Sequence, residues 1–284
     1  MVLTLTIAAI MYAVLVVSNG TAITPDGHYY LAMGRGYSVP RPYAYRLLPR
    51  LLGSVMQWRV THAVAWLLLA MATHGLGERF GVNGTCVAIA LLALPSLRQS
   101  VSWPVLLDVP LLAAATLTAC LAIWSPTAAV LVLPFLLLIH ERAPFVAALY
   151  CLPLVPFAWL FVALLIVVVF VAVLHESLDR HPDEQAVDWL RNPVRAAIAR
   201  HRFTCNNWEV WVKPLGLSFA GVFTGGWWPV VALVAGYAGC LAAQDRARIY
   251  TIAALPLSIA AVSTFGEYGA VVALVNWFVI TKEV

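Results

Sequence analysis

The chain has 284 residues, of which 62% are hydrophobic and only 11% are charged, and its mean hydropathy is +0.88. An ordinary soluble domain has about 45–50% apolar and about 25% charged residues, so a soluble protein of this composition could not cover its own surface. The composition therefore predicts an integral membrane protein. The formal net charge of +4 is small and gives no indication of nucleic-acid binding.

Bilayer thickness sets the expected architecture. A hydrocarbon core about 30 Å thick needs about 20 apolar residues per helix, so the chain has room for roughly 8–11 spans. We expect an all-α, polytopic transmembrane helix bundle with several short or broken helices, in one integral membrane domain covering residues 1–284. Two polar loops, residues 19–59 and 175–209, are expected to carry amphipathic surface helices.

The predicted elements begin with an apolar helix over residues 2–18. This segment lacks a basic n-region, so we expect a retained helix and not a signal peptide. Residues 43–58 are amphipathic and are expected to lie along the membrane surface. The predicted spans and apolar runs that follow are 60–75, 86–94, 104–124, 128–139, 143–155, 157–174, 211–223, 228–243, 249–264 and 270–280.

Two of these runs, 86–94 and 128–139, are too short to cross a bilayer. About 12 residues of helix rise only about 18 Å. Each run is followed by charged residues, Arg98 in one case and His140-Glu141-Arg142 in the other. Because polar backbone at membrane depth is tolerated only inside protein or beside a wet cavity, these runs predict broken helices around a polar site.

If successive spans cross the membrane in opposite directions, most of the charged residues fall on one membrane face. A charge within a span costs about 2.5–3.5 kcal/mol on insertion scales and usually marks function. The pattern therefore predicts a polar cavity that opens to this face. The alternative is that pairs such as Arg98 with Asp108, or Glu141 with Arg142, are buried ion pairs that lock helices together.

The segment of residues 25–49 reads PDGHYYLAMGRGYSVPRPYAYRLLP and places an acid shortly after the first span, before an arginine-rich stretch. It resembles the first extracytoplasmic loop of the GT-C superfamily, membrane glycosyltransferases that use polyprenyl-phosphate sugars. The resemblance covers topology over roughly residues 1–175, and we expect no counterpart of the C-terminal soluble domain of most members. It implies Asp26 as the catalytic base and Asp108 as a second acid. The residues implied in substrate binding are Tyr29, Tyr30, Arg46, Arg98, His140, Glu141, Arg142, Asp245, Arg246 and Arg248.

The residue types suit this chemistry independently. Sugar transfer from a lipid phosphate needs a carboxylate to take the acceptor proton and cations to stabilise the leaving phosphate. The arginine fork matches phosphate geometry. No metal site is predicted, although Mg²⁺ or Mn²⁺ would need only one or two carboxylates. Asp26 also fits a plain turn residue after Pro25, and most of the tyrosines fit an interfacial aromatic belt.

The sequence thus predicts a membrane glycosyltransferase that moves a sugar from a polyprenyl-phosphate donor to an acceptor, in contact with the lipid bilayer. Two other classes stay open: a transporter or flippase of an amphiphilic or anionic substrate, and a non-catalytic membrane assembly protein. The resemblance places the charged face on the extracytoplasmic side of the plasma membrane. The positive-inside rule argues for the opposite orientation.

Overall fold

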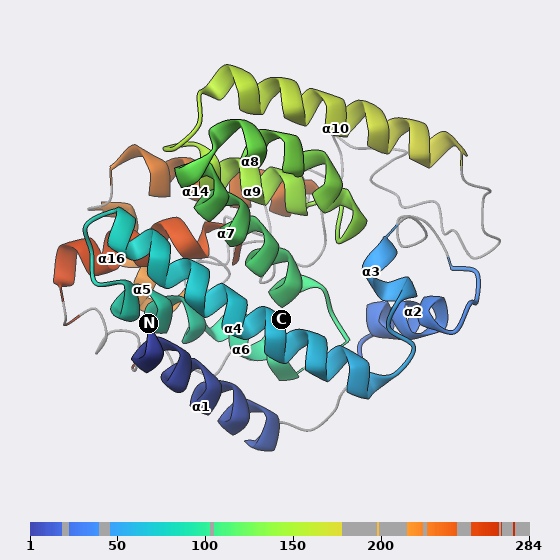
Figure 1. The fold of residues 1–284 in the computed structure, drawn as a ribbon, viewed down its shortest axis with the longest axis horizontal. Helices are drawn as coiled ribbons and strands as arrows, with labels where there is room; N and C mark the ends of the chain where they lie inside the picture. Colours follow the sequence, from blue (N-terminus) through green and yellow to red (C-terminus); the bar gives the residue numbers. More distant parts are fainter. Residues whose placement is uncertain are drawn as a thin grey trace. The chain divides into compact units, whose positions relative to one another are not determined.

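The computed structural model describes residues 1–18, 23–39, 46–102, 105–177, 215–223, 226–242 and 251–266, together with Ile198, Tyr268 and Val275. Every regular element in these ranges is helical (Figure 1), which confirms the all-α class for the described residues. Backbone contacts divide the chain into two compact units. The first unit contains residues 1–8, 73–99 and 185–284, and the second contains residues 9–72 and 100–184.

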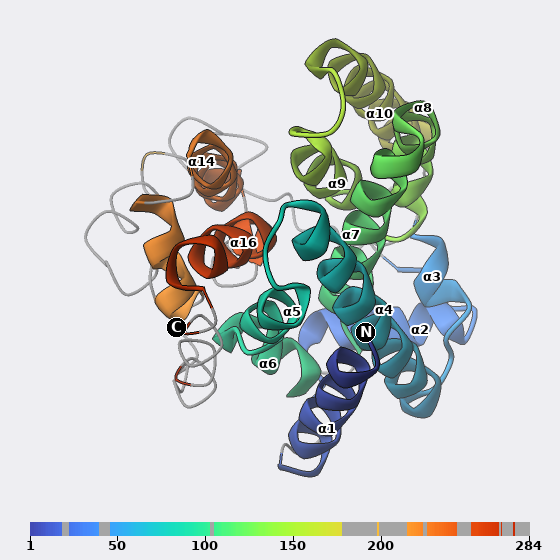
Figure 2. The ribbon, with the colours of Figure 1, turned by 60° about the vertical axis from the view of Figure 1, so that its left-hand side comes forward.

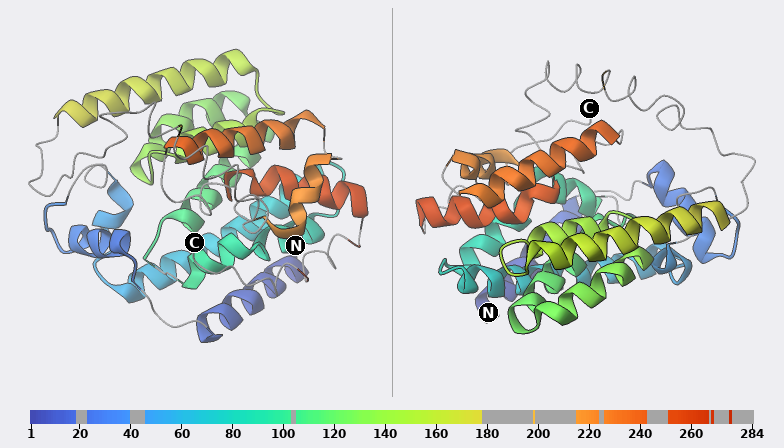
Figure 3. Two further views of the ribbon diagram at one scale, coloured as in Figure 1. Left: turned by 180° about the vertical axis from the view of Figure 1, so that it is seen from behind. Right: turned by 90° about the horizontal axis from the view of Figure 1, so that it is seen from above.

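The second unit holds the helices that position the candidate site. Helix α7 packs against α9 and α8, and α10 packs against α8, α9 and the short 3-10 helix η2 (Figure 3). Helix α2 packs against α3. The bounds are α2 (Pro25–Gly34), α3 (Leu47–Arg50), α7 (Asp108–Trp124), α8 (Pro126–Val132), η2 (Leu133–Leu138), α9 (Ala143–Cys151) and α10 (Phe157–Ser177). Helices α1 (Val2–Ser18) and α4 (Val55–Arg79) have residues in both units.

The first unit is organised around α16, which contacts α5, α14 and the 3-10 helix η3 (Figure 2). Helix η3 crosses α16 closely at Gly221, where an added Cβ would lie 2.6 Å from the carbonyl oxygen of Leu257. The bounds are α5 (Gly84–Leu92), α6 (Pro95–Ser102), η3 (Gly216–Phe223), α14 (Trp227–Ala242), η4 (Thr251–Ala253) and α16 (Ala254–Phe265).

Local sequence explains where several helices begin. The side chain of Thr24 accepts a hydrogen bond from the backbone N–H of Gly27 at 3.1 Å, and Pro25 occupies the first position of α2. Asn83 caps α5 in the same way by accepting from the N–H of Cys86 at 3.2 Å. These N-caps satisfy backbone donors that the first turn of a helix leaves without partners.

The expected surface segment of residues 43–58 does not form one continuous helix. In its described part, residues 46–58, the four-residue α3 is followed by α4, which begins at Val55. The reason is a capping box: Ser54 Oγ accepts from the N–H of Gln57 at 3.3 Å, while Gln57 Oε1 accepts from the N–H of Ser54 at 3.0 Å. This reciprocal pair starts a new helix, so the polar residues before position 60 belong to α4.

Only α4, with 25 residues, is by itself long and apolar enough to cross a membrane among the helices of the described chain. The pair α5–α6, bent by 62° at a break before Pro95, supplies a second span if its two pieces act as one. A long core helix in a soluble protein meets the same criterion. The polytopic arrangement is therefore taken up below as a proposal.

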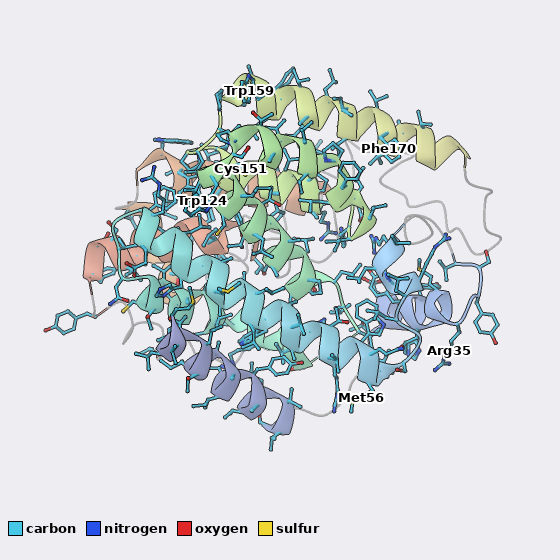
Figure 4. All side chains as sticks on the ribbon, in the orientation of Figure 1. Arg35, Met56, Trp124, Cys151, Trp159 and Phe170 are labelled. Carbon is cyan, nitrogen blue, oxygen red and sulfur yellow. The ribbon has the colours of Figure 1, made fainter. Side chains whose placement is uncertain are left out.

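Helix α10 is apolar around its circumference. Its buried side is a narrow stripe formed by Leu160, Ala163 and Val167, which follow the three- and four-residue spacing of one helix face. The other faces carry large exposed apolar side chains, among them Trp159 and Phe170 (Figure 4). A soluble protein rarely exposes a contiguous apolar surface of this kind unless another phase or molecule covers it.

Candidate functional site

An ion pair between the buried Arg46 and the partly exposed Glu141 lies at the centre of the candidate site in the second unit. Arg46 directly precedes α3, and Glu141 lies in the turn between η2 and α9, 95 positions later. Arg46 Nη2 donates to Glu141 Oε1 at 2.5 Å, and Arg46 Nε donates to Oε2 at 2.9 Å. The fork of Arg46 is thus engaged in bidentate contact, the strong geometry for a guanidinium and a carboxylate. Arg46 is only 3% exposed.

Tyr30 and His140 complete this cluster, which we call the Arg46 cluster (Tyr30, Arg46, His140 and Glu141). Arg46 Nη1 donates to the hydroxyl oxygen of Tyr30, and the guanidinium carbon lies 5.6 Å from the centre of the Tyr30 ring. His140 Nδ1 lies 3.2 Å from Glu141 Oε2 and 3.1 Å from the backbone N–H of Arg142. A protonated Nδ1 donates to the carboxylate, whereas an unprotonated Nδ1 accepts from the backbone.

The Arg46 cluster is held by an aromatic core. The ring of Tyr30 stacks on Trp58, with 5.7 Å between ring centres, and the indole N–H of Trp58 donates to the carbonyl of Leu52 at 3.2 Å. Both rings are fully buried, in a core that also includes residues 105–107. This core ties α2 to the first turn of α4, so the position of the Tyr30 hydroxyl is set by packing as well as by its hydrogen bond.

Asp26 lies one turn before Tyr30 on α2. Residues four apart share one helix face, so Asp26 is on the same side of α2 as the Tyr30 ring. The carboxylate is half-buried. The start of α2 lies close to another segment of the same unit at Gly27, where an added Cβ would lie 3.1 Å from the carbonyl oxygen of Val105.

Asp108 follows the same segment of residues 105–107 and opens α7, where it is buried. A carboxylate in the first turn is favoured by the helix dipole. Both acids implied by the resemblance therefore flank one short piece of chain: Asp26 precedes Gly27, which contacts Val105, and Asp108 follows Leu107 directly.

His62 is a buried polar residue that the sequence reasoning missed. Its Nε2 lies 2.6 Å from the carbonyl oxygen of Leu106, and its ring lies 6.5 Å edge-on from Trp58. Its Nδ1 is buried and has no hydrogen-bond partner among the described residues. The available signal was a histidine inside the apolar run of α4, because ionisable groups within spans are uncommon and usually functional.

The other residues implied in substrate binding lie in different parts of the chain. Tyr29 is half-buried and packs against the aromatic core, and Arg142 directly precedes α9. Arg98 lies on α6 in the first unit. Asp245, Arg246 and Arg248 lie outside the described residues, as do residues 178–197 and 199–209 of the second polar loop.

Metal ligands do not gather in the described part of the chain. No group of three or more His, Cys, Asp or Glu side chains there could hold an ion. His140 and Glu141 form only a pair.

Comparison with protein families, curated proteins and solved structures found no match to this chain. The geometry itself brings together a buried guanidinium, a phenol and an imidazole–carboxylate pair, with the half-buried carboxylate of Asp26 on the same face of α2 as the phenol. Such a set is able to accept a proton at one point and to stabilise negative charge at another.

Proposed function

We propose that this protein is an integral membrane glycosyltransferase of GT-C type that moves a sugar from a polyprenyl-phosphate donor to an acceptor. The observation that carries the proposal is the convergence of Tyr30, Arg46, His140 and Glu141 within one unit. Tyr30 lies one helical turn after Asp26 on α2. Burying an ion costs several kcal/mol after relaxation. A charged cluster of this size is therefore expected where chemistry uses it.

The proposed reaction assigns one role to each side chain. Asp26 accepts the proton of an acceptor hydroxyl, whose oxygen forms a bond to the anomeric carbon of the donor sugar. The bond between that carbon and the phosphate oxygen breaks, and polyprenyl phosphate leaves with the bonding electrons. Arg46 and Tyr30 supply N–H and O–H donors for the charge that develops on the phosphate.

We assign to Glu141 the role of holding Arg46 until the donor phosphate binds. A phosphate that takes the fork of Arg46 has the same bidentate geometry as a carboxylate, so it displaces Glu141. The displaced Glu141 carboxylate stays next to His140 Nδ1, which stabilises it when this nitrogen is protonated. Glu141 thus holds Arg46 in place before the donor binds.

Membrane residence is supported by exposed apolar surface. Large apolar side chains are exposed along α10, and also on α1 at Ile10, Val14 and Val17. Hydrocarbon contact removes the cost of exposing such side chains to water. The length and composition of α4 support the same conclusion.

A second candidate function, a transporter or flippase of an anionic amphiphile, is favoured by one observation. The α5–α6 pair is bent by 62° just before Pro95, and broken apolar helices line the binding sites of many transporters. Uptake of a polyprenyl-phosphate sugar into liposomes without any covalent product would favour this candidate.

The test is sugar transfer by purified protein in liposomes, with radiolabelled polyprenyl-phosphate sugars as donors and a membrane extract of the source cells as acceptor. We expect Asp26→Asn to lower the transfer rate by about 10²–10⁴-fold, because a general base contributes on that scale. Glu78→Gln in the first unit is the matched control, since the amide oxygen can still accept from the N–H of Gly84. Transfer by Asp26→Asn at the rate of the unmodified protein would remove the role of Asp26.

A further inference from the structure

One corner of the second unit combines exposed arginines with exposed apolar side chains. It is formed by the end of α2, the whole of α3 and the first turn of α4, and Arg35 and Met56 mark it in Figure 4. Leu47, Leu51 and Met56 are 44%, 65% and 70% exposed. We call this surface the arginine corner; its members are Arg35, Leu47, Arg50, Leu51, Met56 and Arg59.

Backbone contacts hold the three pieces together. An added Cβ on Gly34, the last residue of α2, would lie 2.2 Å from the carbonyl oxygen of Leu52. Next to it, Arg35 Nε donates to the carbonyl of Gly53 at 3.4 Å. The end of α2 therefore contacts the linker between α3 and α4 directly. These backbone contacts fix the three pieces of the corner relative to one another.

Helical spacing then alternates apolar and basic groups across the surface. Leu47 and Arg50 are three positions apart on α3, and Leu51 caps the C-terminal end of this helix with helical backbone angles, so the three side chains are neighbours. Met56 and Arg59 are three positions apart on α4. Such a mixture is typical of segments that lie in the headgroup layer, with apolar side chains in the acyl boundary and cations at the phosphates.

The stretch of chain that forms the corner is basic. Residues 27–77 contain five arginines and no aspartate or glutamate. Of these arginines, Arg46 is buried and paired with Glu141. Arg35 and Arg50 are exposed and Arg59 is half-buried, so their side chains reach the surface.

The length of α4 indicates at which level of the membrane the corner lies. Its 25 residues rise about 37 Å, somewhat more than the hydrocarbon core of about 30 Å. If α4 crosses the bilayer, its first turn, which carries Met56 and Arg59, lies at one headgroup layer. The arginines therefore sit at the level of the lipid phosphates.

We propose that the arginine corner binds the phosphate groups of anionic phospholipids, with Leu47, Leu51 and Met56 inserted into the acyl boundary. This inference rests on the membrane residence in the proposed function and does not depend on sugar transfer. Each arginine near an anionic surface contributes about 1 kcal/mol, or about fivefold in affinity. Three arginines acting together select an anionic headgroup over a zwitterionic one.

The test is lipid retention by native mass spectrometry. Purified, delipidated protein is incubated with equal amounts of phosphatidylglycerol and phosphatidylcholine, and the bound lipids are counted. We expect the unmodified protein to prefer phosphatidylglycerol. The triple variant Arg35→Gln, Arg50→Gln, Arg59→Gln should lose this preference, and each single variant should weaken it by about fivefold. The matched control is the triple variant Arg35→Lys, Arg50→Lys, Arg59→Lys, which keeps the three positive charges and should keep the preference.

The effect of salt on the lipid preference tests the proposal without any variant. Raising the ionic strength to 1 M shortens the screening length to about 3 Å, so the preference of the unmodified protein should fall strongly. An equal preference in the unmodified protein and the glutamine triple variant, or a preference that salt leaves unchanged, would overturn the proposal. Loss of sugar transfer from Asp26→Asn leaves the lipid preference intact, so failure of the enzyme proposal and failure of this one are distinguishable.

Discussion

The two units each bury a polar cluster, and the clusters differ in charge. In the first unit, Thr4 Oγ1 lies 3.0 Å from His74 Nδ1 and 2.9 Å from Thr85 Oγ1. This group, which we call the threonine clasp (Thr4, His74 and Thr85), joins α1, α4 and α5. The Arg46 cluster in the second unit instead brings a guanidinium and a carboxylate together from segments 95 positions apart.

This difference in charge indicates that the two clusters have different roles. Hydroxyl and neutral imidazole groups satisfy one another without any buried ion, so the threonine clasp needs no explanation beyond helix association. An ion pair of similar burial gains little stability over an apolar replacement. We therefore assign chemistry to the Arg46 cluster and helix packing to the threonine clasp.

The largest expected effect is on the Arg46 cluster. Glu141→Gln leaves the buried guanidinium without its counter-charge, and we expect it to lower the free energy of unfolding by about 3–5 kcal/mol. Denaturant titration in detergent, followed by circular dichroism, measures this change. The double variant Arg46→Met, Glu141→Leu should recover most of the stability but no transfer activity. A loss below about 1 kcal/mol in Glu141→Gln would contradict the burial of this pair.

Tyr30→Phe probes the same cluster without removing either charge. The hydroxyl accepts from Arg46, and hydrogen bonds to charged groups are worth about 1.5–3 kcal/mol. We expect a loss in this range by the same titration, together with slower sugar transfer. A stability equal to that of the unmodified protein would show that the bond from Arg46 to the Tyr30 hydroxyl contributes nothing measurable.

The smallest effect is expected in the threonine clasp. Thr85→Val keeps the side-chain shape and removes the hydroxyl, and polar contacts between membrane helices average about 0.6 kcal/mol. We expect a stability loss of about this size and an unchanged transfer rate. A large fall in transfer with little change in stability would give the threonine clasp a functional role and remove the contrast between the two units.

Apolar runs predicted the helices well where the end of the apolar run is also close to the end of the helix. The run 2–18 coincides with α1, and 157–174 falls within α10. The prediction was less accurate at α4, which extends beyond the run 60–75 at both ends. Apolarity marks only the stretch suited to lipid, whereas the Ser54–Gln57 capping box sets where the helix begins.

The members of the Arg46 cluster were candidates from the sequence, but their pairing was not. Glu141 was considered with its neighbour Arg142, and the structure pairs it with Arg46. Nothing local to either residue encodes a contact between such distant segments, because it depends on how α2, α3 and α9 pack. Arg98 shows the converse: its charge made it a candidate, yet it belongs to the other unit.

Gly34 has a consequence for how relatives of this chain can be recognised. Its Cα faces the carbonyl group of Leu52 with no room for a side chain between them, since any Cβ would lie 2.2 Å from that oxygen. Arginines and leucines in the arginine corner can exchange with similar residues while lipid contact persists. At position 34 no other amino acid preserves the crossing. In divergent sequences, a glycine at this point should therefore outlast the charged residues around it.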